Sequence, residues 1–140
     1  MKLIYIATLI FILCIPFSCR DKYDNCTEED YANCDTERPG IGRAVIHVTI
    51  NDDNPYVPVS VYEGNFEQGH LLFRDTLYEG SSSFYLETEK FYSFTATYGL
   101  ANDTTIAVDG GEVGIISYQM CELRCYEVRV LDIDLKLLNY

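Results

Sequence analysis

The sequence predicts an all-β protein, built as a single antiparallel β-sandwich of about seven to eight strands. From Gly40 onward, apolar and polar residues alternate in short stretches, the pattern of strands that bury one face. Clusters of Gly, Asn, Asp and Ser separate these stretches at the short intervals typical of sandwiches. No stretch of this region has a sustained helical period, so helices linking parallel strands are not expected.

Residues 1–18 have the layout of an export signal peptide. Lys2 precedes an uncharged run of 15 residues from Leu3 to Phe17, and a small residue, Ser18, follows. A permanent membrane-spanning helix needs about 20 apolar residues. Pro16, near the end of the run, also disfavours a continuous helix. We therefore expect a signal that is removed.

The end of this run, "CIPFSC" (residues 14–19), resembles the lipobox of bacterial lipoproteins. In that motif a small residue precedes a cysteine that is lipidated and becomes the new N-terminus. The resemblance implies cleavage after Ser18 and a fatty acyl anchor, such as palmitate, on Cys19. Pro16 and Phe17 depart from the motif, which prefers a Leu-like and a small residue there. Ordinary secretion is the alternative, but the region lacks a small-x-small cleavage site.

The remaining chain is acidic. Removing residues 1–18 leaves 122 of the 140 residues, enough for one domain, and the loss of Lys2 takes the formal charge from −12 to −13. Such a body is repelled by nucleic-acid phosphates and by anionic membrane surfaces. We expect no nucleic-acid partner, and attachment to a membrane only through the lipid, since two or more acyl chains anchor stably.

Residues 19–39 are expected to form a tether with an N-terminal cysteine segment. The four cysteines left in the domain predict two disulfides: Cys26, Cys34, Cys121 and Cys125. Their spacings differ from the C-x2-C knuckles of zinc sites. If "CELRC" (121–125) is extended, its cysteines lie about 13 Å apart. A disulfide spans about 7 Å, so both bridges would then join the tether to the last strand. A tight loop would instead permit local pairs.

One helical turn is expected just before the body of residues 40–140, and several strands are expected in its first half. "CTEEDYA" (26–32), just before it, could form the turn with Thr27 as N-cap. Pro58 predicts that "VPVSVYEG" (57–64) is an edge strand or carries a bulge. "HLLFRDTLY" (70–78) and "SSFYLETE" (82–89) are further strands. In three strands one face is apolar throughout: Ala44, Ile46, Val48 and Ile50; Val57, Val59 and Val61; Tyr92, Phe94, Ala96 and Tyr98.

The second half is expected to contain the strands "DTTIAVDGG" (103–111) and "GEVGIISYQ" (111–119), separated by a turn at Gly110 and Gly111. The last strand follows Cys125, and its apolar register changes at Val130 and Leu131. Two adjacent apolar residues at such a change predict a β-bulge.

The segment "VPVSVYEGNFEQGHLLFRDTL", with the later "FYLETEKFYSFTATY", resembles transthyretin-like (prealbumin-like) sandwiches. The lipobox, the N-terminal cysteines and the C-terminal "CELRCY" also resemble uncharacterised Bacteroidota lipoproteins. The resemblance covers roughly residues 40–138 and implies a scaffold rather than an activity. No active-site residue of such a family maps onto this chain.

No catalytic motif or cofactor site is predicted. His47 and His70 lack metal-ligand spacing, and no G-x-S-x-G elbow occurs. The acidic loops Asn51 to Asn54 and Asp109 to Glu112 could bind Ca²⁺, but turn chemistry explains both. We therefore expect no metal, no cofactor and no enzymatic activity.

Two kinds of surface residue suggest binding or modification. The chain has 12 Tyr and no Trp, and five of the tyrosines could form a face for a protein or glycan partner: Tyr62, Tyr78, Tyr85, Tyr118 and Tyr126. Packing across strands is the alternative explanation. "DTL" and "DTT" resemble acceptors of Bacteroidota O-glycosylation, which makes Thr76 and Thr104 candidate acceptors.

Taken together, these patterns predict a lipid-anchored protein of the cell envelope, at the periplasmic or surface face of an outer membrane. Its expected role is a non-catalytic binding or structural accessory module. A subunit or anchor of a surface filament is the alternative, and an envelope hydrolase is a weaker one.

Overall fold

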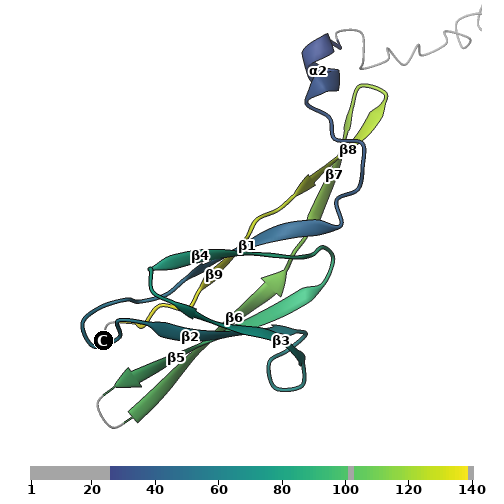
Figure 1. The fold of residues 1–140 in the computed structure, drawn as a ribbon. Coiled ribbons are helices and arrows are strands. Elements are labelled where there is room, and N and C mark those ends of the chain that lie inside the picture. Colours follow the sequence, from purple (N-terminus) through teal and green to yellow (C-terminus); the bar gives the residue numbers. More distant parts are fainter. Residues whose placement is uncertain (1–25, 101–102, 139–140) are drawn as a thin grey trace, which may run out of the picture.

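The computed structural model describes residues 26–100 and 103–138, so the predicted signal peptide and Cys19 lie outside the described residues. The described chain is all-β, as predicted, apart from one short helix (Figure 1). Its elements are α2 (Glu28–Ala32), β1 (Ile41–His47), β2 (Val57–Glu63), β3 (His70–Leu77), β4 (Ser81–Glu87), β5 (Phe91–Leu100), β6 (Asp103–Glu112), β7 (Ile115–Met120), β8 (Leu123–Val128) and β9 (Leu131–Asp134).

The strands form two sheets and a separate hairpin. One sheet has the order β4-β1-β9, the other has the order β3-β2-β5-β6, and β7 pairs only with β8. Every pairing is antiparallel except that of β1 with β9, which is parallel. The parallel pair departs from the predicted antiparallel arrangement. It arises because the chain returns to the body from the hairpin in the direction of β1.

The two sheets share one hydrophobic core, and the predicted apolar faces supply most of it. Ala44, Ile46 and Val48 come from β1 and its extension, and Ile133 and Leu135 come from β9 and its extension. The four-stranded sheet contributes the larger set: Val57, Val59, Val61, Leu77, Tyr92, Phe94, Ala96 and Tyr98. Alternation with period two thus places one face of β1, β2 and β5 out of water, the main stabilising contribution.

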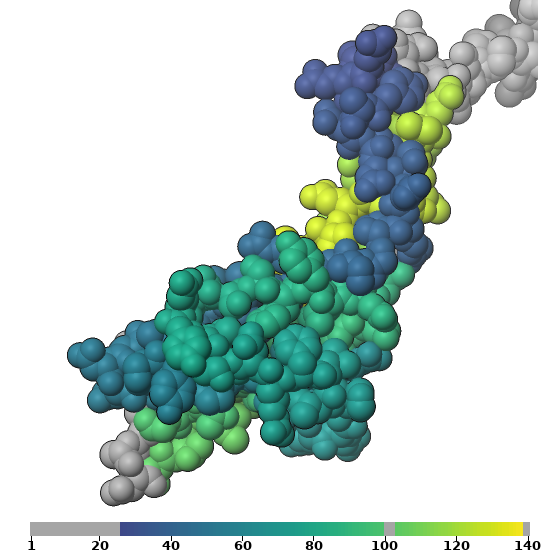
Figure 2. Space-filling model, in the orientation of Figure 1, coloured from purple at the N-terminus to yellow at the C-terminus, as the bar shows by residue number. Residues whose placement is uncertain are grey.

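The hairpin extends from one end of this body as an arm. β7 and β8 continue outward beyond the two sheets, and α2 lies beside their tip (Figure 1). The space-filling view shows the same elongated outline, with the N-terminal segment running along the arm (Figure 2).

Tyr98 fixes the segment that follows β9. Its hydroxyl donates a hydrogen bond to the Leu135 carbonyl (2.8 Å) and accepts one from the Thr49 backbone N–H (3.0 Å). The Thr49 hydroxyl in turn accepts from the Leu137 backbone N–H (3.0 Å). Burial raises the pKa of the Tyr98 phenol above its ordinary value, so the ring stays neutral and can donate.

The predicted turn at Gly110 and Gly111 is wrong. β6 runs through both residues, which pair with Ser93 and Tyr92 of β5. A Cβ atom on Gly111 would lie 2.6 Å from Leu131 Cδ1, so the glycine is needed for close approach to β9 rather than for a turn. The chain instead leaves the sheet after Glu112.

The predicted bulge at Val130 and Leu131 is also wrong. β8 ends at Val128 and β9 begins at Leu131, and the two strands belong to different sheets. The change of apolar register therefore marks a passage from the arm to the body. A β-bulge does occur in the pairing of β2 with β3, between Val61 and Tyr62.

Pro58 does not make β2 an edge strand, because β2 lies between β3 and β5. The pairing of β2 with β5 begins at Val59, however, one residue after Pro58. At Pro58 itself β2 pairs only with β3, so the missing N–H is tolerated there.

Candidate functional site

Two disulfides fasten the N-terminal segment to the arm. Cys26 is bonded to Cys121 at the hairpin turn, and Cys34 is bonded to Cys125 in β8. The Cα atoms of the two pairs are 6.0 and 5.0 Å apart, so the arrangement is the cross-linked one that an extended "CELRC" predicts. Cys121 adopts a φ of 56° at the turn, so only the part of this stretch from Leu123 is a strand.

The short helix α2, within the tether, is capped by residues of its own sequence. Thr27 caps α2 as predicted: its hydroxyl accepts from the Asp30 N–H, and the Asp30 carboxylate accepts from the Thr27 N–H (2.7 Å). The Asp30 carboxylate also accepts from the Thr27 hydroxyl (2.8 Å), and the two hydrogen bonds that it accepts from Thr27 hold the pKa of the Asp30 carboxyl below its ordinary value. No residue of α2 is buried, so the helix depends on this cap and on the adjacent Cys26 disulfide.

After Cys34, the segment makes further contacts with the arm and with the body. The Tyr126 backbone N–H donates to the Asp35 carbonyl (2.8 Å). The Arg38 guanidinium forms an ion pair with Glu89 and lies 6.0 Å from the centre of the Tyr126 ring. Besides its disulfides, the tether is therefore joined to the arm at Asp35 and Arg38, and Arg38 also joins it to the body through Glu89.

The two sheets of the body have four edges, those of β4, β9, β3 and β6, and three of these are protected. The edges of β6 and β9 face one another, and the Asp109 carboxylate of β6 accepts a hydrogen bond from the Asp134 backbone N–H (2.9 Å). On the opposite side, edge strand β3 carries the extra residue of the bulge, Leu72, and the charged residues Arg74 and Asp75. Bulges and charges of this kind discourage pairing with another strand.

The edge of β4 lacks such protection. β4 is seven residues long, has Glu87 as its single charged residue and, within the described part of the chain, pairs only with β1. The Val48 N–H donates a hydrogen bond to the Gly80 carbonyl (3.0 Å), so Gly80 and every second residue after it direct their backbone N–H and C=O groups toward β1. By alternation, the backbone groups of Ser81, Ser83, Tyr85 and Glu87 point to the open side. Their side chains are all exposed.

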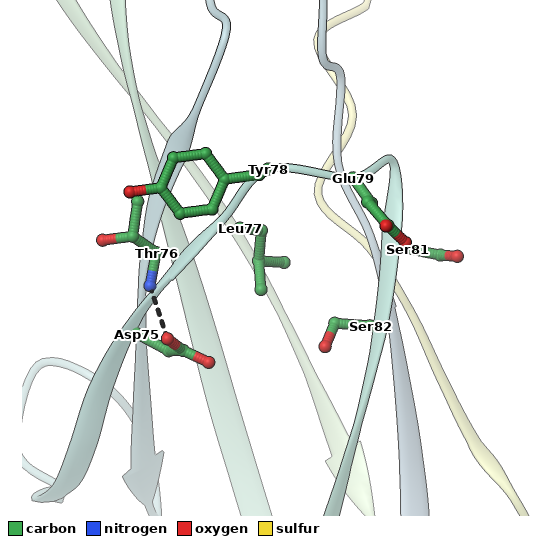
Figure 3. A pocket seen from close by; sticks show the side chains of 7 residues that line it. All are labelled: Asp75, Thr76, Leu77, Tyr78, Glu79, Ser81 and Ser82. Carbon is green, nitrogen blue, oxygen red and sulfur yellow. Dashed lines mark hydrogen bonds between the residues drawn. The ribbon is translucent and has the colours of Figure 1, made fainter.

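A hollow of about 270 Å³ lies between the β4 edge and β3. Figure 3 shows Asp75, Leu77 and Ser82 turned toward the space between the two strands. Tyr78 and Glu79, in the turn that joins the strands, also line it, together with Thr76 and Ser81. Asp75 Oδ1 accepts from the Thr76 backbone N–H (2.7 Å). Among the described residues, neither Asp75 nor Glu79 takes part in an ion pair.

The two candidate glycosylation acceptors are accessible. Thr76 is half-buried beside this hollow, and Thr104 is exposed near the start of edge strand β6. Each lies on an edge strand.

The five tyrosines singled out in the sequence come from five different segments. Tyr85 (74 % exposed) and Tyr78 (71 % exposed) lie on β4 and in the turn before it, and so flank the open edge. Tyr62 is half-buried on β2, and Tyr118 and Tyr126 are half-buried on the arm. Sequence reasoning missed Tyr56, whose ring centre lies 6.3 Å from that of Tyr78. Its position in a loop gave no strand pattern to indicate a face.

Three other groups of polar residues make contacts within the fold. His47 Nε2 lies 3.0 Å from the Asp132 carboxylate, across the pairing of β1 with β9. Asn51 and Asn54 exchange backbone hydrogen bonds, as the turn interpretation expects. The Lys90 ammonium lies 2.6 Å from the Glu87 carboxylate and 3.1 Å from the Glu63 carboxylate. These two carboxylates, Glu87 more than Glu63, raise the pKa of Lys90 above its ordinary value.

Within residues 26–100 and 103–138, no group of three or more His, Cys, Asp or Glu side chains is placed to hold a metal ion. No helix in the same ranges is long and apolar enough to cross a membrane. No protein-family model, no curated protein and no solved structure matches the chain.

Proposed function

We propose that the protein is a lipid-anchored, non-catalytic binding or structural accessory module of the cell envelope, built on a transthyretin-like β-sandwich. One observation carries the proposal: the disulfides Cys26–Cys121 and Cys34–Cys125 hold the N-terminal segment against the arm. Cys26 stands seven positions after Cys19. Seven residues span at most about 25 Å, so a lipid on Cys19 would keep the hairpin tip close to the membrane.

The shape and charge of the protein support the same proposal. The arm separates the tether from the core, so an anchored chain would present the body outward (Figure 1). Without residues 1–18, the formal charge changes from −12 to −13 through the loss of Lys2, which gives this body no attraction to an anionic bilayer. Lipid, arm and charge would act together to hold a water-exposed module at a defined distance from the membrane.

The sandwich assignment draws support from the shared core. Residues from both sheets belong to one buried cluster, which is how two facing sheets stabilise a sandwich. The exposed features nearest to it, an open strand edge and flanking tyrosines, are suited to contact with a protein or glycan partner.

The alternative role, a subunit or anchor of a surface filament, requires a strand that can be exchanged between copies. β9 is the shortest strand described, but the bonds from Tyr98 to Leu135 and from Leu137 to Thr49 hold the segment after it. These bonds disfavour its release, and we therefore prefer the accessory module.

The test is fractionation of the full chain in a bacterium that matures lipoproteins. Cys19→Ser should move the protein from the membrane pellet to the soluble fraction and abolish incorporation of a labelled fatty acid. Cys14→Ser is the matched control and should leave both unchanged. A Cys19→Ser protein that still sediments with membranes would overturn the proposal.

A further inference from the structure

We infer that the open edge of β4 and the hollow beside it bind an extended segment of a partner protein, with a lysine or arginine side chain in the hollow. The inference deepens the proposed binding function and rests on it. The partner segment would add to the β4-β1-β9 sheet as a further strand.

The backbone of β4 offers the first half of the site. Ser81, Ser83, Tyr85 and Glu87 direct their N–H and C=O groups to the open side, a row able to pair with one strand. The other three edges of the two body sheets are bulged, charged or matched against one another. Among the described residues of the two body sheets, β4 is thus the edge that has one charged residue, Glu87, and no other strand beside its open side.

The hollow offers the second half. It lies on the inner side of β4, so every second side chain of an added strand would point toward it or toward the neighbouring core. Leu77 is an apolar surface for the methylene groups of a lysine or arginine. Asp75 and Glu79 provide the carboxylates for the charged end, with Ser81 and Ser82 beside them.

Farther along β4, the inner side becomes apolar. Phe84 is half-buried, with its ring centre 5.2 Å from that of Phe73, and Leu86 is buried. The partner segment should therefore carry a basic residue opposite the Ser81 end and apolar residues at the next alternate positions.

A second copy of this chain fits the edge less well. β4 of one copy would pair with β4 of another around a two-fold axis, in the antiparallel sense. The arms would then point in opposite directions and could not both reach one membrane.

The test uses the full chain purified in detergent, so that it does not depend on the lipid. The probes are two short labelled peptides that alternate Val and Thr, with one Lys at either the N- or the C-terminal end, and the same peptides with Glu in place of Lys. Fluorescence anisotropy measures affinity, and amide NMR shifts locate the bound peptide. We expect one Lys peptide to bind at least about fivefold more tightly than its Glu counterpart and to shift the amides of β4.

Two variant pairs separate edge from hollow. Ser83→Pro removes an N–H that points to the open side and should weaken binding at least about tenfold, whereas Ser83→Ala keeps it and should change binding less than about twofold. Thermal melting of both variants confirms that they fold. Asp75→Asn with Glu79→Gln should weaken only the Lys peptide, by about fivefold, whereas Asp52→Asn with Asp53→Asn removes the same charge elsewhere and should not.

Three outcomes would overturn the inference: no binding of either Lys peptide, equal binding by the Pro and Ala variants, or equal affinity for Lys and Glu peptides. A dimer that forms without peptide and is lost only in Ser83→Pro would assign the edge to a second copy instead. None of these outcomes affects the Cys19 fractionation test, so failure of the edge site and failure of the anchor are distinguishable.

Discussion

The hydroxyl of Tyr98 lies 2.8 Å from the Leu135 carbonyl oxygen and joins the four-stranded sheet to the segment that follows β9. The ring is fully buried, and the same hydroxyl accepts from the Thr49 N–H. One side chain thus satisfies backbone groups in the extensions of both β1 and β9, which are far apart in sequence.

Replacing Tyr98 with Phe should therefore destabilise the protein. The change keeps the ring but leaves the Leu135 carbonyl and the Thr49 N–H without this partner, a loss of about 1–3 kcal/mol in the free energy of unfolding. Urea denaturation measures it. Tyr85→Phe, at an exposed position, is the control and should change stability by less than about 0.5 kcal/mol. Equal effects of the two substitutions would contradict the assigned role of the hydroxyl.

Stability should fall as pH rises above about 10. Burial raises the pKa of Tyr98, and the neighbouring Glu87 and Glu63 raise that of Lys90. As pH rises, each of these two groups loses its proton at a lower pH in the unfolded chain than in the folded protein. Their contribution to the free energy of unfolding is therefore fully present below the ordinary pKa near 10 and decreases above it. Urea midpoints measured between pH 8 and about 11 test this, and the Tyr98→Phe variant should show a shallower decline. A wild-type midpoint that is constant across this range would contradict the expectation.

Reduction of the disulfides should release the tether but leave the core folded. The core cluster contains no cysteine, whereas α2 has five residues and none of them is buried. A helix this short does not persist alone in water. Hydrogen exchange with and without a reductant should show rapid exchange of the α2 amides after reduction, with protection retained in β2 and β5. Loss of protection in β5 at the same rate would show that the disulfides also hold the body together.

Substituting Gly42 should be costly because two valines occupy the space beside it. A Cβ atom there would lie 2.3 Å from Val113 Cγ1 and 2.7 Å from Val128 Cγ1, where the base of the arm packs on β1. We expect Gly42→Ala to cost about 1–3 kcal/mol in urea denaturation. Gly40→Ala, two residues earlier, has nothing within 4 Å of the new atom and should be nearly neutral. A neutral Gly42→Ala would mean that the arm can shift away from β1.

The sequence predicted the all-β class and the buried faces because alternation with period two is a local signal. Tyr92, Phe94 and Ala96 were assigned correctly for this reason. The N-cap at Thr27 was equally local. The division of the strands into sheets could not be predicted from local patterns, because it depends on which strands meet after the chain has folded.

The errors came from residues whose role is decided by distant neighbours. Gly110 and Gly111 have the composition of a turn, but they lie in β6 because Leu131 of β9 approaches one of them. The change of register at Val130 and Leu131 suggested a bulge, yet it separates two strands with different partners. The open edge of β4 had no sequence signal, since an edge is defined by the absence of a neighbour in space.

The pairing of the cysteines determines the order in which folding and disulfide formation must occur. Cys26 and Cys34 leave the ribosome together, whereas their partners follow 95 and 91 residues later. An oxidant that acted on thiols as they emerged would join the two early cysteines to each other. Correct bonding therefore requires that oxidation wait until the body has brought the hairpin into place, or that an isomerase exchange the premature bond afterwards.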